Sequence, residues 1–154
     1  MPQSALRSTC LVLALLGTAS LSAHSQTTLN GLVSGIELCE QAVCGAAIFV
    51  AGFAGEIADR PAVGLAVGGI EHDDLPVVIG ATADITGGLW SIRALRRTVS
   101  GKVTGGTLQK LNDTQFGVVM SMEINEGGSG DATFTAILDH GPFPPTIRGV
   151  IRQP

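Results

Sequence analysis

Short apolar segments separated by turn-forming residues fill most of this chain, and this spacing restricts the fold more than any other feature. From residue 45 onward, segments of about 7 to 12 residues alternate or run apolar and end at Gly, Pro, Asn or Asp. The connections between them are shorter than the helical crossover that a pair of parallel strands needs. The sequence therefore predicts an all-β fold, an antiparallel meander of seven or eight strands.

Closure of such a meander into a barrel removes its exposed edges, which are otherwise prone to pair with other chains. We therefore expect a small closed or nearly closed β-barrel over residues 45–154, with a β-sandwich as the alternative. The clearest alternation lies in Thr114–Ile124, where Phe116, Met120 and the other even-numbered apolar residues are predicted to face inward.

The segment Ala62–Ile70 has an unusual division between its two faces. Val63, Leu65 and Val67 alternate with Ala and Gly, so one face is bulky and the other nearly bare. A bare face indicates that something packs closely against it. A neighbouring sheet, a bend of the barrel and a ligand are the three alternatives.

The first 25 residues are typical of a secretory signal peptide. Arg7 precedes an apolar stretch shorter than a membrane span, and small residues precede the expected cleavage site before Gln26. The sequence therefore predicts a secreted or periplasmic protein with no membrane span after cleavage. Residues 26–44 would form an N-terminal segment before the barrel.

Two cysteines remain after the predicted cleavage. Cys39 and Cys44 form an even pair in an oxidising compartment, so we expect a structural disulfide. A short helix is predicted from about Gly35 to Val43, but residues five apart in a regular helix point to different faces. The helix must therefore end or distort before Cys44, and Gly45 suits the unusual backbone angles of that exit.

The composition offers little chemistry. A formal net charge of −4 with 14% charged residues argues against a nucleic-acid partner. We predict no metal, cofactor or assigned catalytic residue, because the acidic cluster around His72 is equally well a solvated turn and no nucleophile elbow is present. His72 and His140 each stand beside an acid and are weak candidates for a ligand or partner site.

Trp90, Arg93 and Arg97 complete the weak candidates for contact with a ligand or partner. On a single strand, Arg93 and Arg97 would share one face, and Arg96 would share the other with Trp90. Such an array can hold a carboxylate or phosphate, or it can face water and pair with the chain's own acids. Asn112 begins a glycosylation sequon at a predicted hairpin tip, relevant in a eukaryotic source.

These observations lead us to expect a non-enzymatic exported barrel that binds a small apolar ligand or a protein partner. One alternative is a hydrolase-type or isomerase-type enzyme on the same barrel, using His140 or His72 with a neighbouring acid. Another is a structural, envelope-associated protein. Whether the barrel interior is hollow or filled distinguishes a protein that carries a ligand from one that binds through its loops, because only a hollow barrel can enclose a ligand.

Overall fold

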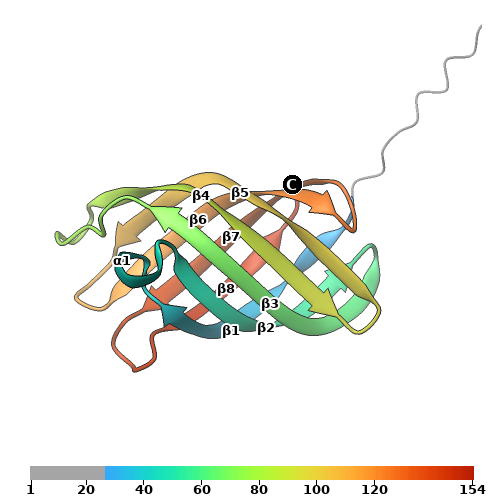
Figure 1. Ribbon diagram of the computed structural model, residues 1–154, viewed down its shortest axis with the longest axis horizontal. Coiled ribbons are helices and arrows are strands. Elements are labelled where there is room, and N and C mark those ends of the chain that lie inside the picture. The colour runs from blue at the N-terminus through green and yellow to red at the C-terminus, as the bar shows by residue number, and fades with distance from the viewer. Residues whose placement is uncertain (1–26) are drawn as a thin grey trace, which may run out of the picture.

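The computed structural model describes residues 27–154 and shows a closed barrel of eight antiparallel strands (Figure 1). Each strand pairs with its neighbours in the chain, and the first pairs with the last. The prediction of an antiparallel meander closed into a barrel is confirmed. The predicted signal peptide lies outside the described residues. The elements are β1 (Leu29–Cys39), α1 (Gln41–Cys44), β2 (Ala47–Ile57), β3 (Arg60–His72), β4 (Thr82–Ala94), β5 (Arg97–Lys110), β6 (Gln115–Glu126), β7 (Gly130–Asp139) and β8 (Thr146–Arg152).

Strand β1 belongs to the barrel, although we expected the barrel to begin at residue 45. Residues 35–39 were predicted as helix but continue this strand, and the helix is confined to Gln41–Cys44. Gly31 to Ile36 pair with both β2 and β8. These two rows of backbone hydrogen bonds outweigh the weak helix propensity of a segment that contains glycine.

The predicted disulfide is present and defines the corner between β1 and β2. It joins Cys39, the last residue of β1, to Cys44, the last residue of α1, with Cα atoms 6.1 Å apart. Gly45 follows with a φ of 77°, in the left-handed region that glycine adopts without strain. The backbone angles predicted for Gly45 are therefore confirmed. The helix itself does not end before Cys44 as expected: it begins only at Gln41 and includes Cys44, and the bond can form because Cys39 lies in the strand and not in the same helix.

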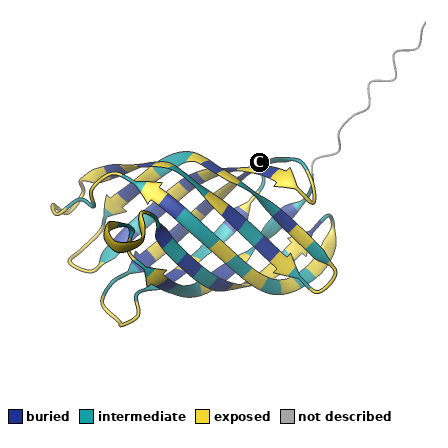
Figure 2. Cartoon of the chain, in the orientation of Figure 1, coloured by how far each residue is buried: buried dark blue, intermediate teal, exposed yellow. Residues whose placement is uncertain are grey.

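The hydrophobic core lies inside the barrel and takes side chains from all eight strands. Along the strands in Figure 2, buried positions are interspersed with exposed and half-buried ones. The predicted inward face of Thr114–Ile124 is confirmed, because Phe116, Val118, Met120, Met122 and Ile124 are all buried. Their neighbours in the chain are exposed or half-buried. This alternation is that of a sheet with one wet and one dry face.

Two segments differ from what their local sequence indicates. The apolar run at residues 77–81 is typical of a strand but forms a loop, and β4 begins at Thr82. Gly87 and Gly88 are typical of a turn but lie within β4, where they allow the strand to bend around the barrel. The turn between β4 and β5 is instead formed by Leu95 and Arg96, since Ala94 pairs directly with Arg97.

The connections divide between the two ends of the barrel. We call the end with α1 and the loops 73–81, 111–114 and 140–145 the helix end. The other end, called the turn end, carries the turns 58–59, 95–96 and 127–129 (Figure 1). Within residues 27–154, no helix is long and apolar enough to cross a membrane.

Candidate functional site

The bare face of β3 points into the barrel and borders an apolar cavity. Gly68 pairs in register with Phe49 on β2 and with Trp90 on β4, so a glycine lies between two large aromatic side chains. Val63, Leu65 and Val67, which form the bulky face of this strand, are exposed on the outer wall. The small residues therefore leave a space that the larger side chains of a core strand would normally fill.

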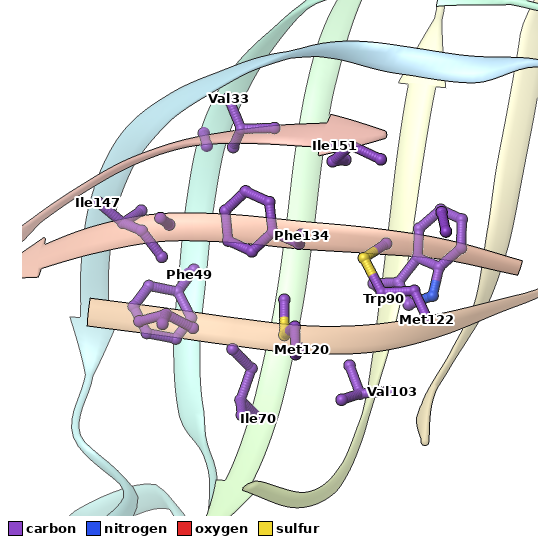
Figure 3. Packing of buried hydrophobic residues seen from close by; sticks show 14 of the residues in the cluster. Val33, Phe49, Ile70, Trp90, Val103, Met120, Met122, Phe134, Ile147 and Ile151 are labelled. Carbon is purple, nitrogen blue, oxygen red and sulfur yellow. The ribbon is translucent and has the colours of Figure 1, made fainter. Parts of the chain in front are cut away.

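The cavity has a volume of about 60 Å³ and an almost wholly apolar lining. Besides β3, its walls come from strands across the barrel, including Met120, Met122 and Phe134 (Figure 3). Trp90, a predicted candidate, borders the cavity and donates its Nε1 hydrogen to the Lys102 backbone carbonyl at 3.2 Å. The space exceeds what one water molecule needs but offers water very little polar surface, so it favours an apolar occupant.

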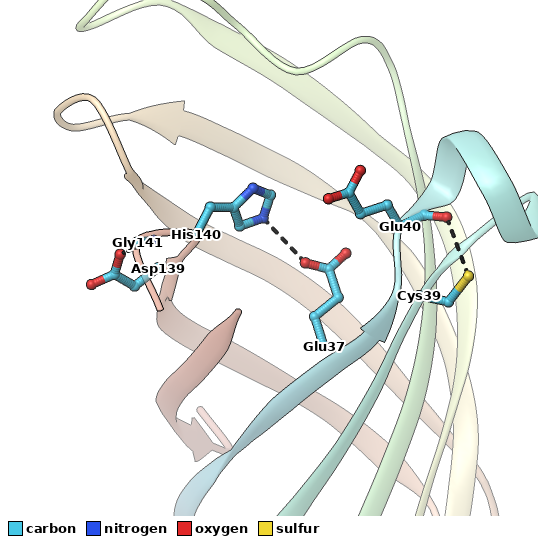
Figure 4. Close-up of polar contacts among 6 residues, drawn as sticks. All are labelled: Glu37, Cys39, Glu40, Asp139, His140 and Gly141. Carbon is cyan, nitrogen blue, oxygen red and sulfur yellow. Dashed lines mark hydrogen bonds and ion pairs between the residues drawn. The ribbon is translucent and has the colours of Figure 1, made fainter. Parts of the chain in front are cut away.

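A polar pair lies inside the barrel towards the helix end. Glu37, near the end of β1, is only 4% exposed, and its Oε2 lies 3.1 Å from Nε2 of His140 in the β7–β8 loop (Figure 4). Both atoms are buried, and neither makes a hydrogen bond of good geometry to a described residue. The His140 ring also packs against Phe116, with ring centroids 5.5 Å apart.

Burial shifts both members of the pair away from their charged forms. Desolvation, reinforced by the charge of Glu40, raises the pKa of Glu37 from 4.5 to about 7. Desolvation lowers the pKa of His140 below its ordinary 6.5, against the opposing effects of Glu40 and Asp139. The barrel thus favours a neutral carboxyl beside a neutral imidazole, two groups that together can donate and accept a proton.

The space beside this pair limits its chemistry. The cavity that Glu37 and His72 line has a volume of about 20 Å³, which suits one water molecule and excludes an organic substrate. A groove of about 150 Å³ lies outside it, between the end of β1 and Phe143–Pro145 of the β7–β8 loop. The pair therefore has the components of acid–base chemistry without an enclosed substrate chamber.

The acids next to the two predicted histidines do not serve as their partners. Asp139 accepts hydrogen bonds from the Gln115 side chain at 2.9 Å and the Gly141 backbone at 2.8 Å, which hold the pKa of its carboxyl below the ordinary 3.8. His72 places Nδ1 2.6 Å from the backbone carbonyl of Asp73. Within residues 27–154, no group of three or more His, Cys, Asp or Glu side chains is arranged to hold a metal ion.

The predicted arginine array is divided by the β4–β5 turn. Arg93 is exposed near the end of β4, Arg96 lies in the turn and Arg97 begins β5. Since Ala94 pairs with Arg97, the arginines do not form one strand face as expected. Trp90 lies inside the barrel, so the structure does not bring it together with the exposed Arg93.

Sequence reasoning missed Glu37, the most deeply buried charged residue in the described part of the chain. The available signal was the two-residue period of β1, in which Leu29, Val33 and Glu37 share the inward face. The predicted helix over residues 35–43 hid this period. No local pattern indicates the contact with His140, which lies 103 positions later in the chain.

Comparison of the chain with protein-family models, with curated protein sequences and with solved structures finds no match.

Proposed function

We propose that this protein is an exported, non-enzymatic binding module that takes a small apolar ligand into the barrel beneath β3. The apolar cavity between Phe49 and Trp90 is the observation that carries this proposal. Met120 and Met122 form part of its wall, and flexible thioether side chains adapt to ligands of different shape. The disulfide supports export, because such bonds persist in oxidising compartments.

The chain supplies its own probe for this cavity. Trp90 is the only tryptophan and the sequence has no tyrosine, so the intrinsic fluorescence above 300 nm reports directly on the cavity wall. Xenon and benzene serve as test ligands, since both enter dry apolar cavities in proteins. We expect a saturable change in Trp90 fluorescence with xenon, and a weaker one with the larger benzene.

A matched pair of valine substitutions tests where the ligand lies. A Cβ added at Gly68 comes no closer than 3.8 Å to another residue and points into the barrel. A Cβ added at Gly52, on the outer face of β2, has the same nearest distance of 3.8 Å. Gly68→Val should abolish xenon binding and Gly52→Val should retain it. An absence of saturable binding to the wild type, or equal binding by both variants, would refute the proposal.

A protein partner at the helix end is the second candidate function. Exposed apolar side chains gather on the loops of that end, including Val43, Val78 and Phe143, the last of which is 99% exposed. The same loops carry the exposed acids Glu40 and Asp113. A partner with an apolar, basic surface would complement them.

A photo-crosslinking amino acid tests this second candidate. Placed at Phe143, it should link the partner in the native extracellular compartment, and mass spectrometry should identify a protein with a basic surface. The matched control places it at Val119, which is exposed on the outer wall of β6. Equal crosslinking from both positions would show that the helix end is not a specific interface.

A further inference from the structure

Three arginines line one groove at the turn end of the barrel. The groove has a volume of about 480 Å³ and runs between the β2–β3 connection and the β4–β5 turn. Arg60, the first residue of β3, lies on one side, and Arg96 and Arg97 lie on the other. The pairing of β3 with β4 holds the two sides together, although their arginines are distant in sequence.

No carboxylate of the described chain forms a salt bridge with these arginines or lines their groove. Among residues 27–154, the one close contact between a carboxylate and a basic side chain joins Glu37 on β1 to His140 in the β7–β8 loop, at the helix end. Asp59, in the turn directly before Arg60, accepts a hydrogen bond from the Thr28 hydroxyl at 2.5 Å and does not line the groove. Three unpaired cations in one groove are notable in a chain whose formal net charge is −4.

Apolar side chains form the rest of the groove. Ile57, Ala62, Val63 and Leu95 line it together with the arginines. Guanidinium groups bind carboxylates and phosphates through paired hydrogen bonds, and an apolar wall adds affinity for a hydrocarbon body. We propose that this groove binds a small organic anion, whose carboxylate or phosphate pairs with the arginines while its apolar body lies against the wall.

This site is independent of the cavity beneath β3. The residues that line the groove do not line that cavity, and the groove lies at the rim of the barrel. Failure of xenon to bind would therefore leave the anion site untouched, and failure of anions to bind would leave the cavity untouched.

Titration calorimetry of the full-length protein at low salt tests the proposal with four probes: hexanoate, hexyl phosphate, inorganic phosphate and hexylammonium. We expect hexanoate or hexyl phosphate to bind, and inorganic phosphate to bind at least about tenfold more weakly than hexyl phosphate, because it lacks the apolar body. Hexylammonium should not bind. Affinity for the anions should fall as salt is raised, since screening weakens exposed charge pairs.

Arginine variants locate the binding. The double substitution Arg96→Gln/Arg97→Gln should weaken anion binding about tenfold or more, while the control Arg93→Gln should change it less than twofold. Arg93 is exposed two residues before the turn but does not line the groove. The side chains at all three positions are partly or fully exposed, so these substitutions should leave the fold intact. The thermal unfolding of each variant checks this.

Unchanged affinity in the double variant, an equal loss in Arg93→Gln, or equal binding of hexylammonium would overturn the assignment. Inorganic phosphate that binds as tightly as hexyl phosphate would overturn the role of the apolar wall. Binding that does not weaken with salt would overturn the role of the arginine charges.

Discussion

Substitution of Glu37 by glutamine should make the protein more stable at alkaline pH and leave it unchanged at acidic pH. The folded barrel raises the pKa of this carboxyl from 4.5 to about 7, so the folded state holds the proton more tightly than the unfolded state does. Between these two pH values, folding therefore keeps a proton that the unfolded chain has lost. The free energy of unfolding of the wild type consequently falls as pH rises from about 4.5 to 7, and the loss is complete above that window.

The size of this effect follows from the same pKa shift. A tenfold change in proton affinity corresponds to about 1.4 kcal/mol, so the shift of Glu37 amounts to about 3 kcal/mol. Glutamine has nearly the same shape as glutamate and remains neutral at every pH. At pH 8, Glu37→Gln should therefore exceed the wild type in stability by about 3 kcal/mol, and at pH 4.5 the two should agree.

His140 acts in the opposite direction, which makes the comparison between variants essential. Its lowered pKa keeps it neutral in the folded state, so its contribution to stability is lost as pH falls below about 6.5. Wild type and Glu37→Gln both carry this histidine, and the difference between their curves isolates the carboxyl.

Urea unfolding between pH 4.5 and 9, followed by Trp90 fluorescence, measures the difference. Glu56→Gln is the matched control, because Glu56 is exposed on the outer face of β2. Its curve should follow the wild type at every pH. A Glu37→Gln variant that is less stable than the wild type at pH 8 would show that attraction to a charged His140 outweighs desolvation, and would refute the predicted loss of stability with rising pH.

The same unfolding assay checks two further substitutions, Met120→Asp and Val119→Asp. Met120 is 7% exposed and Val119 is 48% exposed, so the first should cost about 3 kcal/mol or more and the second less than about 1 kcal/mol; equal costs would contradict the one-sided burial of β6. The double variant Cys39→Ser/Cys44→Ser should lose about 1–3 kcal/mol, since the disulfide closes a short loop. The variant and the native wild type should titrate the same number of free thiols, because the two wild-type cysteines are bonded to each other. Two more titratable thiols in the wild type than in the variant would show that the disulfide is absent. The intact mass of the exported protein should correspond to a chain that begins at Gln26, and a mass that includes residues 1–25 would contradict signal cleavage.

The strand pattern could be predicted where burial alone decides it. In β6, every second side chain meets the core, so Phe116 to Ile124 alternate with exposed residues and the sequence shows the period directly. The disulfide was also predictable, because Cys39 and Cys44 had no competitor once Cys10 was assigned to the signal peptide.

Turns could not be predicted where glycines that are typical of turns lie within strands, or where a turn lacks the residues that usually form one. Gly87 and Gly88 resemble a turn, yet they continue β4, and Gly105 and Gly106 lie in the paired strand β5 with positive φ. Glycines at such positions allow strands to bend as the barrel closes. Leu95 and Arg96 have no turn signature, and only the pairing of the flanking strands identifies them as the connection.

Local sequence patterns could not predict the buried pair of Glu37 and His140, for a different reason. Glu37 reads as a surface residue in any composition-based argument, because carboxylates are almost never fully buried without a partner. That partner, His140, comes from the last loop of the chain and reaches Glu37 only because β8 closes the barrel against β1. The two residues therefore meet because the barrel closes, and the sequence predicted closure only as a general preference for a fold without exposed edges.

Strand β3 shows why the bare face has more than one cause. Phe49 and Trp90 flank Gly68 in register and occupy much of the space that a larger side chain would need, which supports the packing alternative. Packing is nevertheless incomplete, since about 60 Å³ remains and a Cβ at Gly68 would meet no other residue closer than 3.8 Å. A site selected only for stability would tolerate a larger residue there, because filling an apolar cavity increases stability. The ligand alternative therefore depends on the space that the aromatic side chains leave open, and on the glycine that keeps it open.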